Sequence, residues 1–199
     1  MTVKIGVIYY SATGNVHKLA EAITEGAEKA GAEVRLRRVP ELAPDTAIDA
    51  NPRWRRHLES VRDTVKIASH EDLIWADAYA FGTPTRYGNV AAQLKQFIDS
   101  TGQLWVDGHV VGKPATAFTS ALNVHGGNES TLLALYNTLY HWGSIIVPPG
   151  YTDPIKFKDG NPYGVSKVTG ESADLGDDDL EALDHLVMRA LDVSRKLSA

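Results

Sequence analysis

Segments rich in apolar, β-branched residues alternate with segments of helical apolar spacing along most of this chain. Strands are predicted at residues 3–9, 33–39, 77–84, 114–121 and 144–147, and helices follow the first, third, fourth and fifth of them. This alternation predicts an α/β fold with an open parallel sheet and helices on both faces. Right-handed crossovers then bring the strand-to-helix loops to the carboxyl edge of the sheet, where ligands bind in such folds.

The predicted helices are marked by apolar residues three and four positions apart. The first ends near Gly31, the second at Gly102 and the third at Gly143, and the last covers residues 180–197. Residues 40–69 contain three prolines and are interpreted as an insertion after the second strand, with a helix near residues 53–65. No linker rich in Pro, Gly or Ser divides the chain, so one domain, residues 1–199, is expected.

Composition narrows the function classes. The 199 residues carry a net charge of −5 and no long basic run, so nucleic acid is not an expected partner. The arginines at 53, 55 and 56 are interpreted as a solvated face. The absence of cysteine excludes disulfides, thiolate nucleophiles and Cys-ligated metals, and no metal site is expected. With no leader pattern and no apolar run of about 20 residues, no membrane segment is expected and a cytoplasmic location is the simplest interpretation.

The stretch "YSATGNV" joins the first strand to the first helix. Hydroxyls at Ser11 and Thr13 and the unpaired amides of a helix N-terminus suit a phosphate, and Gly14 permits a tight turn. No Lys or Arg lies inside the turn, so hydrogen bonds alone are expected to hold one terminal phosphate, as in a mononucleotide. The structural alternative is an ordinary Ser N-cap.

Two further loops are expected at the same edge. "GTPTRYGN" offers Tyr87 to pack against a flat ring and Arg86 to donate to ring oxygens, although an ordinary turn with a surface arginine has the same composition. "TSALNVHGGNE" is long for a strand-to-helix connection, and long loops that carry glycine are often functional. His125 in this loop either lines the site or faces solvent.

The chain resembles the WrbA family of flavodoxin-like NAD(P)H:quinone oxidoreductases, because seven of its motifs occur in the order and spacing of that family. They are "YYSATGN", "GTPTRYGN", "QFIDSTGQLW", "HGGNESTL", "TLYHWG", "PPGY" and "GNPYG". The resemblance covers about residues 5–164. It implies a five-stranded flavodoxin-like sheet in the order 2-1-3-4-5, bound FMN, NADH or NADPH as donor, a small-molecule quinone as acceptor and a homotetramer. Hydride would pass to FMN and electrons then to a quinone in the same pocket, which implies ping-pong kinetics.

The resemblance also implies roles for individual residues. The FMN phosphate would lie at the first loop, and the second and third loops would flank the flavin ring; the implied contacts are Ser11, Ala12, Thr13, Gly14, Asn15, Val16, Pro84, Thr85, Arg86, Tyr87, Gly88, Ser120, Ala121, Leu122, Asn123, Val124, His125 and Gly126. His141 would reach the flavin from a neighbouring subunit and hydrogen-bond or protonate a quinone oxygen. Substrates would contact Thr13, Trp105 and Tyr151.

The chain departs from the family at three places. His141-Trp142 stands where many members have two histidines, Tyr87 where many have Phe, and residues 121–123 differ from the commoner run of small residues. On residues alone, Trp105 and Tyr151 are interpreted as interface aromatics and His141 as a helix-end histidine. Two other functions stay open: a flavodoxin-type carrier of single electrons, and a regulator that has lost the flavin.

Overall fold

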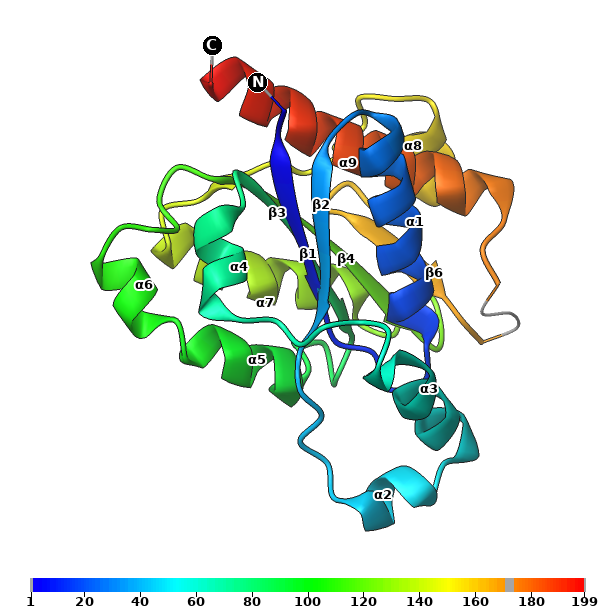
Figure 1. The fold of residues 1–199 in the computed structure, drawn as a ribbon. Helices are drawn as coiled ribbons and strands as arrows, with labels where there is room; N and C mark the ends of the chain where they lie inside the picture. The colour runs from blue at the N-terminus through cyan, green and yellow to red at the C-terminus, as the bar shows by residue number, and fades with distance from the viewer. Residues whose placement is uncertain (1, 171–173, 199) are drawn as a thin grey trace.

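The computed structural model describes residues 2–170 and 174–198. Strands and helices alternate from the first residues onward, as Figure 1 shows. The strands are β1 (Lys4–Tyr9), β2 (Glu33–Arg38), β3 (Ala78–Pro84), β4 (Pro114–Ala121), β5 (Ile145–Ile146) and β6 (Val165–Val168). The helices are α1 (Asn15–Lys29), α2 (Asp45–Asp49), α3 (Pro52–Arg62), α4 (His70–Trp75), α5 (Ala92–Asp99), α6 (Gly102–Val106), α7 (Asn128–His141), α8 (Ile155–Asp159) and α9 (Asp177–Leu197).

All pairs in the sheet are parallel, and the strand order β2-β1-β3-β4-β5 confirms the expected 2-1-3-4-5 arrangement. The expected count of five strands is wrong, because the position beside β4 is shared by two segments. β5 pairs with the start of β4 at Pro114 and Ala115, and β6 pairs with its last four residues. The chain between β5 and β6 therefore interrupts what would otherwise be one strand.

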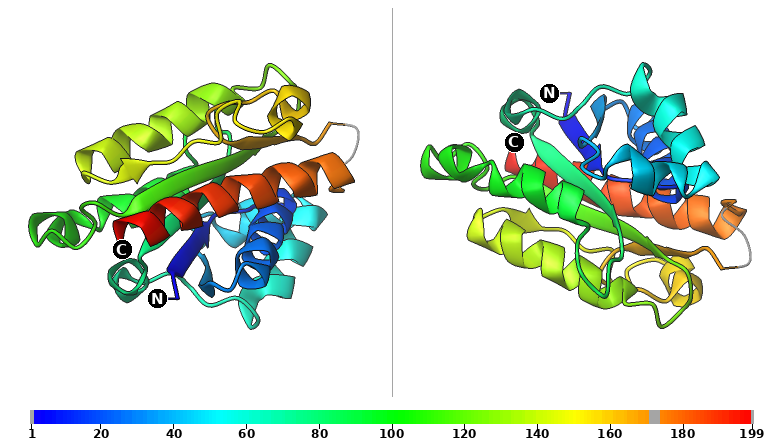
Figure 2. Two further views of the ribbon diagram at one scale, coloured as in Figure 1. Left: turned by 90° about the horizontal axis from the view of Figure 1, so that it is seen from above. Right: turned by 90° about the horizontal axis from the view of Figure 1, so that it is seen from below.

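Helices cover both faces of the sheet (Figure 2). On one face, α1 and α9 bury leucine and valine side chains against β1, β3 and β4, as the fully buried Leu19 and Leu186 illustrate. On the other face, α4, α5 and α7 contribute Leu73, Leu94 and Leu135 to a second core. Because β1, β3 and β4 lie between these layers, nearly all their residues are buried, and most are apolar.

Two helical predictions need correction. The helix expected to close at Gly102 ends at Asp99, and Gly102 begins α6 instead. The hydroxyls of Ser100 and Thr101 donate to the carbonyls of Phe97 and Ile98, and these local bonds accompany the break between the two helices. The segment between β2 and β3 holds α3, which the sequence predicted, and also α2 and α4, which it did not.

In the part of the chain that the structure describes, no helix has both the length and the apolar character that crossing a membrane requires.

Candidate functional site

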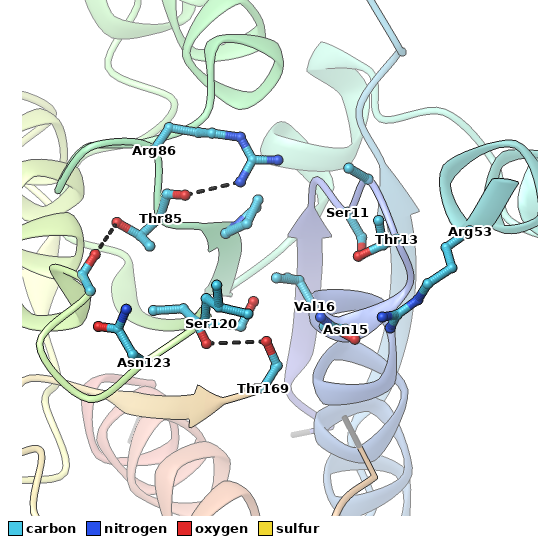
Figure 3. Close-up of a pocket in the computed structure, with 15 residues that line it drawn as sticks. Ser11, Thr13, Asn15, Val16, Arg53, Thr85, Arg86, Ser120, Asn123 and Thr169 are labelled. Carbon is cyan, nitrogen blue, oxygen red and sulfur yellow. Dashed lines mark hydrogen bonds between the residues drawn. The ribbon is translucent and has the colours of Figure 1, made fainter. Parts of the chain in front are cut away.

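A cavity of about 440 Å³ lies where the strand-to-helix loops following β1, β3 and β4 converge. Its size falls within the range of small-molecule sites, roughly 300–1,000 Å³. Figure 3 shows the three loops around one hollow, with side chains directed into it from each. Its lining is Ser11, Ala12, Thr13, Asn15, Val16, Arg53, Pro84, Thr85, Arg86, Ser120, Ala121, Leu122, Asn123, Gly126 and Thr169.

The turn between β1 and α1 presents donors to this cavity. Gly14 occupies the N-cap position with φ of 95°, a left-handed conformation that glycine adopts without strain. Within the described part of the chain, no side chain caps the first-turn amides of α1, so these amides are available to an anion, and the helix dipole adds partial positive charge. Ser11 Oγ accepts from the amide of Gly14 at 3.1 Å, which shapes the turn.

A cation from outside the turn also reaches the cavity. Arg53, expected on a solvated face, lines the hollow together with Thr13 and Asn15. It comes from α3, which lies beside the N-terminal end of α1 (Figure 1). No Asp or Glu is among the described lining residues, whereas Arg53 and Arg86 are both present. The cavity therefore favours an anionic ligand.

Helix α3 is held in place by the carboxylate of Glu41. One oxygen accepts from Tyr10 Oη at 2.8 Å and from Trp54 Nε1 at 2.9 Å, and the other accepts from Gln93 Nε2 at 2.7 Å. Burial alone opposes ionisation of Glu41, but the hydrogen bonds from the Ala43 amide and these three side chains outweigh it and lower its pKa. The carboxylate thus joins the end of β1, α3 and α5.

The loops after β3 and β4 are joined through Thr85. Its hydroxyl donates to the carbonyl of Gly126 at 3.3 Å and accepts from the hydroxyl of Thr131 at 2.7 Å. Arg86 folds back so that its guanidinium donates to the carbonyl of Thr85 at 3.0 Å. These bonds fix the two walls of the cavity relative to each other.

Tyr87 and Gly88 form the tip of a tight turn. Arg86 and Asn89 exchange backbone hydrogen bonds at 2.8 and 3.0 Å, and both tip residues have positive φ, 52° for Tyr87 and 73° for Gly88. Such a conformation is uncommon for a residue with a side chain and is typical of functional loops. Tyr87 is 101% exposed, so none of the described residues covers its ring.

Near the turn between β1 and α1, the ring of His17 stacks on Tyr9 and lies tilted against the ring of His57. Tyr9 Oη lies 2.6 Å from His17 Nδ1, and the rings of His17 and His57 lie 5.2 Å apart. Burial lowers the pKa of both histidines; that of His57 falls to about 4, with His17 and Arg38 as further causes. Burial likewise raises the pKa of Tyr9, and nearby Glu21 adds to that effect. The group is therefore uncharged at neutral pH.

The structure brings together most, not all, of the residues expected at the site. The lining contains residues of all three loops, while Gly14, Tyr87, Gly88, Val124 and His125 belong to these loops without lining the cavity. Sequence reasoning missed Arg53 and Thr169. Thr169 follows β6 and bonds the carbonyl of Ala121 through its amide at 2.8 Å and its hydroxyl at 3.1 Å.

Three other predicted residues lie elsewhere in this chain. His141 and Trp105 line a different hollow of about 450 Å³, between α5, α6 and α7. Tyr151 packs on Phe157 with ring centroids 5.2 Å apart and donates to the carbonyl of Gly160 at 3.1 Å. All three side chains are exposed, so their predicted approach to a flavin stays a prediction that depends on a neighbouring subunit.

The family model for NADPH-dependent FMN reductase matches residues 3–154. This chain belongs to that family. A Deinococcus radiodurans protein named NAD(P)H dehydrogenase (quinone) is 43% identical over 196 residues, covering 98% of this chain and 97% of its own length. A protein of the same name from Sinorhizobium fredii is 45% identical over 172 residues, covering 84% of this chain and 83% of its own length.

Solved structures agree on the fold. A WrbA-like flavodoxin from Agrobacterium tumefaciens superposes with a TM-score of 0.67 at 22% identity, covering 98% of this chain and 99% of its own. FerB from Paracoccus denitrificans, a flavoenzyme NAD(P)H:(acceptor) oxidoreductase, gives a TM-score of 0.57 at 17% identity, with 98% of each chain covered. Together with the curated relatives, these likenesses confirm the resemblance to the WrbA family.

Proposed function

We propose that this chain binds FMN in the cavity at the carboxyl edge of the sheet and uses NADH or NADPH to reduce quinones by two electrons. The observation that carries the proposal is the convergence of three loops, a cation and an uncapped helix N-terminus on one cavity without acidic lining residues. Relatives at 43% and 45% identity that are named NAD(P)H dehydrogenase (quinone) support the same reaction.

The phosphate of FMN fits the turn after β1. Ser11 and Thr13 would donate through their hydroxyls, and the amides at the start of α1 would donate along the helix axis. Arg53 would add a charged contact from α3. A single phosphate needs no metal here, because the donors and the guanidinium neutralise it.

The flavin ring fits between the other two loops. Pro84, Thr85 and Arg86 line one wall and Ser120, Ala121, Leu122 and Asn123 the other, so apolar atoms and hydrogen-bonding groups both border the ring. When bound, FMN would supply the acceptor for hydride and the donor of two electrons. The protein would orient the ring, hold the two walls through Thr85, and leave Tyr87 free to cover the ring or a substrate.

The pocket over the ring is proposed to be completed in a homotetramer. His141 and Trp105 of a neighbouring subunit, together with Tyr151, would border the quinone, and Thr13 would touch the nicotinamide donor. Support comes from the exposure of these aromatic side chains, 52% for Trp105 and 50% for Tyr151. A cytoplasmic location is part of the same proposal.

Purified protein saturated with FMN provides the test. The flavin absorbance should bleach when NADH or NADPH is added without oxygen and return when benzoquinone follows. Steady-state initial rates at several fixed quinone concentrations should give parallel double-reciprocal lines. A protein that binds FMN but is reduced only by a flavoprotein reductase would instead be an electron carrier, and a protein that takes up no FMN would be neither.

A further inference from the structure

A second hollow of about 310 Å³ adjoins the FMN cavity on the side of α3. Its lining consists of Thr13, Arg53, Arg56, His57 and Ser60. Thr13 and Arg53 line both hollows, so the two are neighbours across the phosphate turn. Every lining side chain carries a hydrogen-bond donor or a cation, and no carboxylate is among them.

Four of the five residues that line this hollow belong to one face of α3. Positions 53, 56, 57 and 60 have the spacing of a single helical face. The neighbouring face carries Trp54, which packs against the core, and the buried Val61. A face of this spacing usually carries apolar residues, but here it presents two arginines, a histidine and a serine beside the phosphate turn.

The two arginines of this face have no counter-ion among the residues that the structure describes. Among the described residues, no ion pair or hydrogen bond involves the guanidinium of Arg53 or of Arg56, whereas the guanidinium of Arg55 on the same helix is bound at 2.6 Å by Asp45 and at 2.6 Å by Asp49. The helix therefore neutralises one guanidinium and leaves two to face the hollow. That arrangement suits an external anion with more than one charge.

One lining residue of the hollow, His57, is itself packed against the protein. His57 packs against the turn, since a Cβ at Gly14 would lie 3.4 Å from His57 Nδ1, and its ring meets His17. Burial keeps the pKa of His57 low, at about 4, so this ring adds hydrogen bonding without charge at neutral pH. Glu41 fixes α3 from its other side through Trp54.

We propose that Arg56, Arg53 and Ser60 form a subsite for the 2′-phosphate of NADPH and so give this protein a preference for NADPH over NADH. The inference rests on the proposed NAD(P)H reaction. A donor whose nicotinamide lies over the flavin extends its adenosine end out of the FMN cavity, and the cationic hollow is the adjoining space. Sites that prefer NADH use an acidic residue to accept from the ribose hydroxyls, and this hollow has none.

Arg56→Gln tests the proposal without touching the FMN cavity, because Arg56 lines only the second hollow. In FMN-loaded protein with benzoquinone as acceptor, the ratio of the KM for NADPH to that for NADH should rise about tenfold, which corresponds to about 1.4 kcal/mol. Ser60→Asp, which places a negative charge in the hollow, should raise the same ratio further. Arg62→Gln removes an equal charge from the exposed end of α3 and should leave the ratio unchanged.

A binding measurement separates this inference from the reaction itself. The FMN-loaded protein should bind adenosine 2′,5′-bisphosphate about tenfold more tightly than adenosine 5′-monophosphate, and Arg56→Gln should remove that difference. Equal binding of the two nucleotides by the unmodified protein overturns the subsite, even if quinone reduction is observed. If Arg56→Gln weakened the binding of NADH and NADPH equally, the subsite would also be overturned, because the arginine would then bind a phosphate that the two nucleotides share.

Discussion

Replacing Glu41 with glutamine should destabilise the protein and weaken FMN binding together. The carboxylate accepts five hydrogen bonds, from Tyr10, Trp54, Gln93 and the amides of Leu42 and Ala43. An amide in its place turns one acceptor atom into a donor, so at least two of these bonds are lost whichever way the new side chain lies. At this half-buried position the loss should cost about 2–4 kcal/mol of unfolding free energy.

Urea denaturation followed by far-UV circular dichroism measures this cost. With a slope of about 2 kcal/mol per molar, the midpoint for Glu41→Gln should fall by about 1–2 M. The control Glu59→Gln removes an equal charge from an exposed position on α3 and should stay within about 0.5 kcal/mol. If both variants unfold at the same urea concentration, the assignment of Glu41 as the anchor of α3 is wrong.

The pH dependence provides an internal check on the same residue. The pKa of folded Glu41 lies below its ordinary value of 4.5, so the carboxylate binds fewer protons in the folded state than in the unfolded state. Its contribution is therefore complete above that ordinary value and is lost as the pH falls through the lowered folded pKa. The stability gap between the unmodified protein and Glu41→Gln should narrow over that acidic range and stay constant near neutral pH.

Further variants test the cavity. Arg53→Gln should raise the Kd for FMN about tenfold and weaken its dependence on salt, while Arg62→Gln on the same helix should change neither, as isothermal titration at two salt concentrations will show. Gly127→Ala should cost about 2–4 kcal/mol, because φ is 90° and the new Cβ would lie 2.8 Å from the Cα of Gly88. Gly31 has a similar φ of 80° with open space around it, so Gly31→Ala should cost only about 1 kcal/mol of unfolding free energy. If the two variants lost equal stability, the close contact between residue 127 and Gly88 would not explain the cost of Gly127→Ala.

The sheet was predictable because each of its central strands is marked locally. β1 and β3 are nearly continuous apolar runs, and β4 is apolar except for two threonines and a serine. The strand order was expected from the resemblance to the WrbA family and not from the strands themselves. The split beside β4 was not predictable, since β5 has two residues and β6 alternates only weakly over four. β5 and β6 lie on the same side of β4 because they pair with its two ends, and no local sequence pattern indicates this long-range pairing. Thr169 was missed for the same reason.

The three loops of the cavity were predictable because chain topology alone brings strand-to-helix turns to one edge. Arg53 was not, since nothing next to it in sequence tells where an insertion packs. The helical spacing of residues 53, 56, 57 and 60, beside the face that carries Trp54, identifies a polar face of α3, and that signal was available. Which hollow the face borders depends on the contacts of Glu41 with Tyr10 and Trp54, which lie 31 and 13 residues away in sequence.

The central claim is that FMN is held at the turn between β1 and α1, and titration of the protein with FMN, followed by quenching of flavin fluorescence, tests it most directly. The unmodified protein should bind one FMN per chain, and the double variant Ser11→Ala, Thr13→Ala should raise the Kd at least about a hundredfold, since it loses two charge-assisted hydrogen bonds. An unchanged Kd in the double variant, or no quenching with the unmodified protein, would contradict the account.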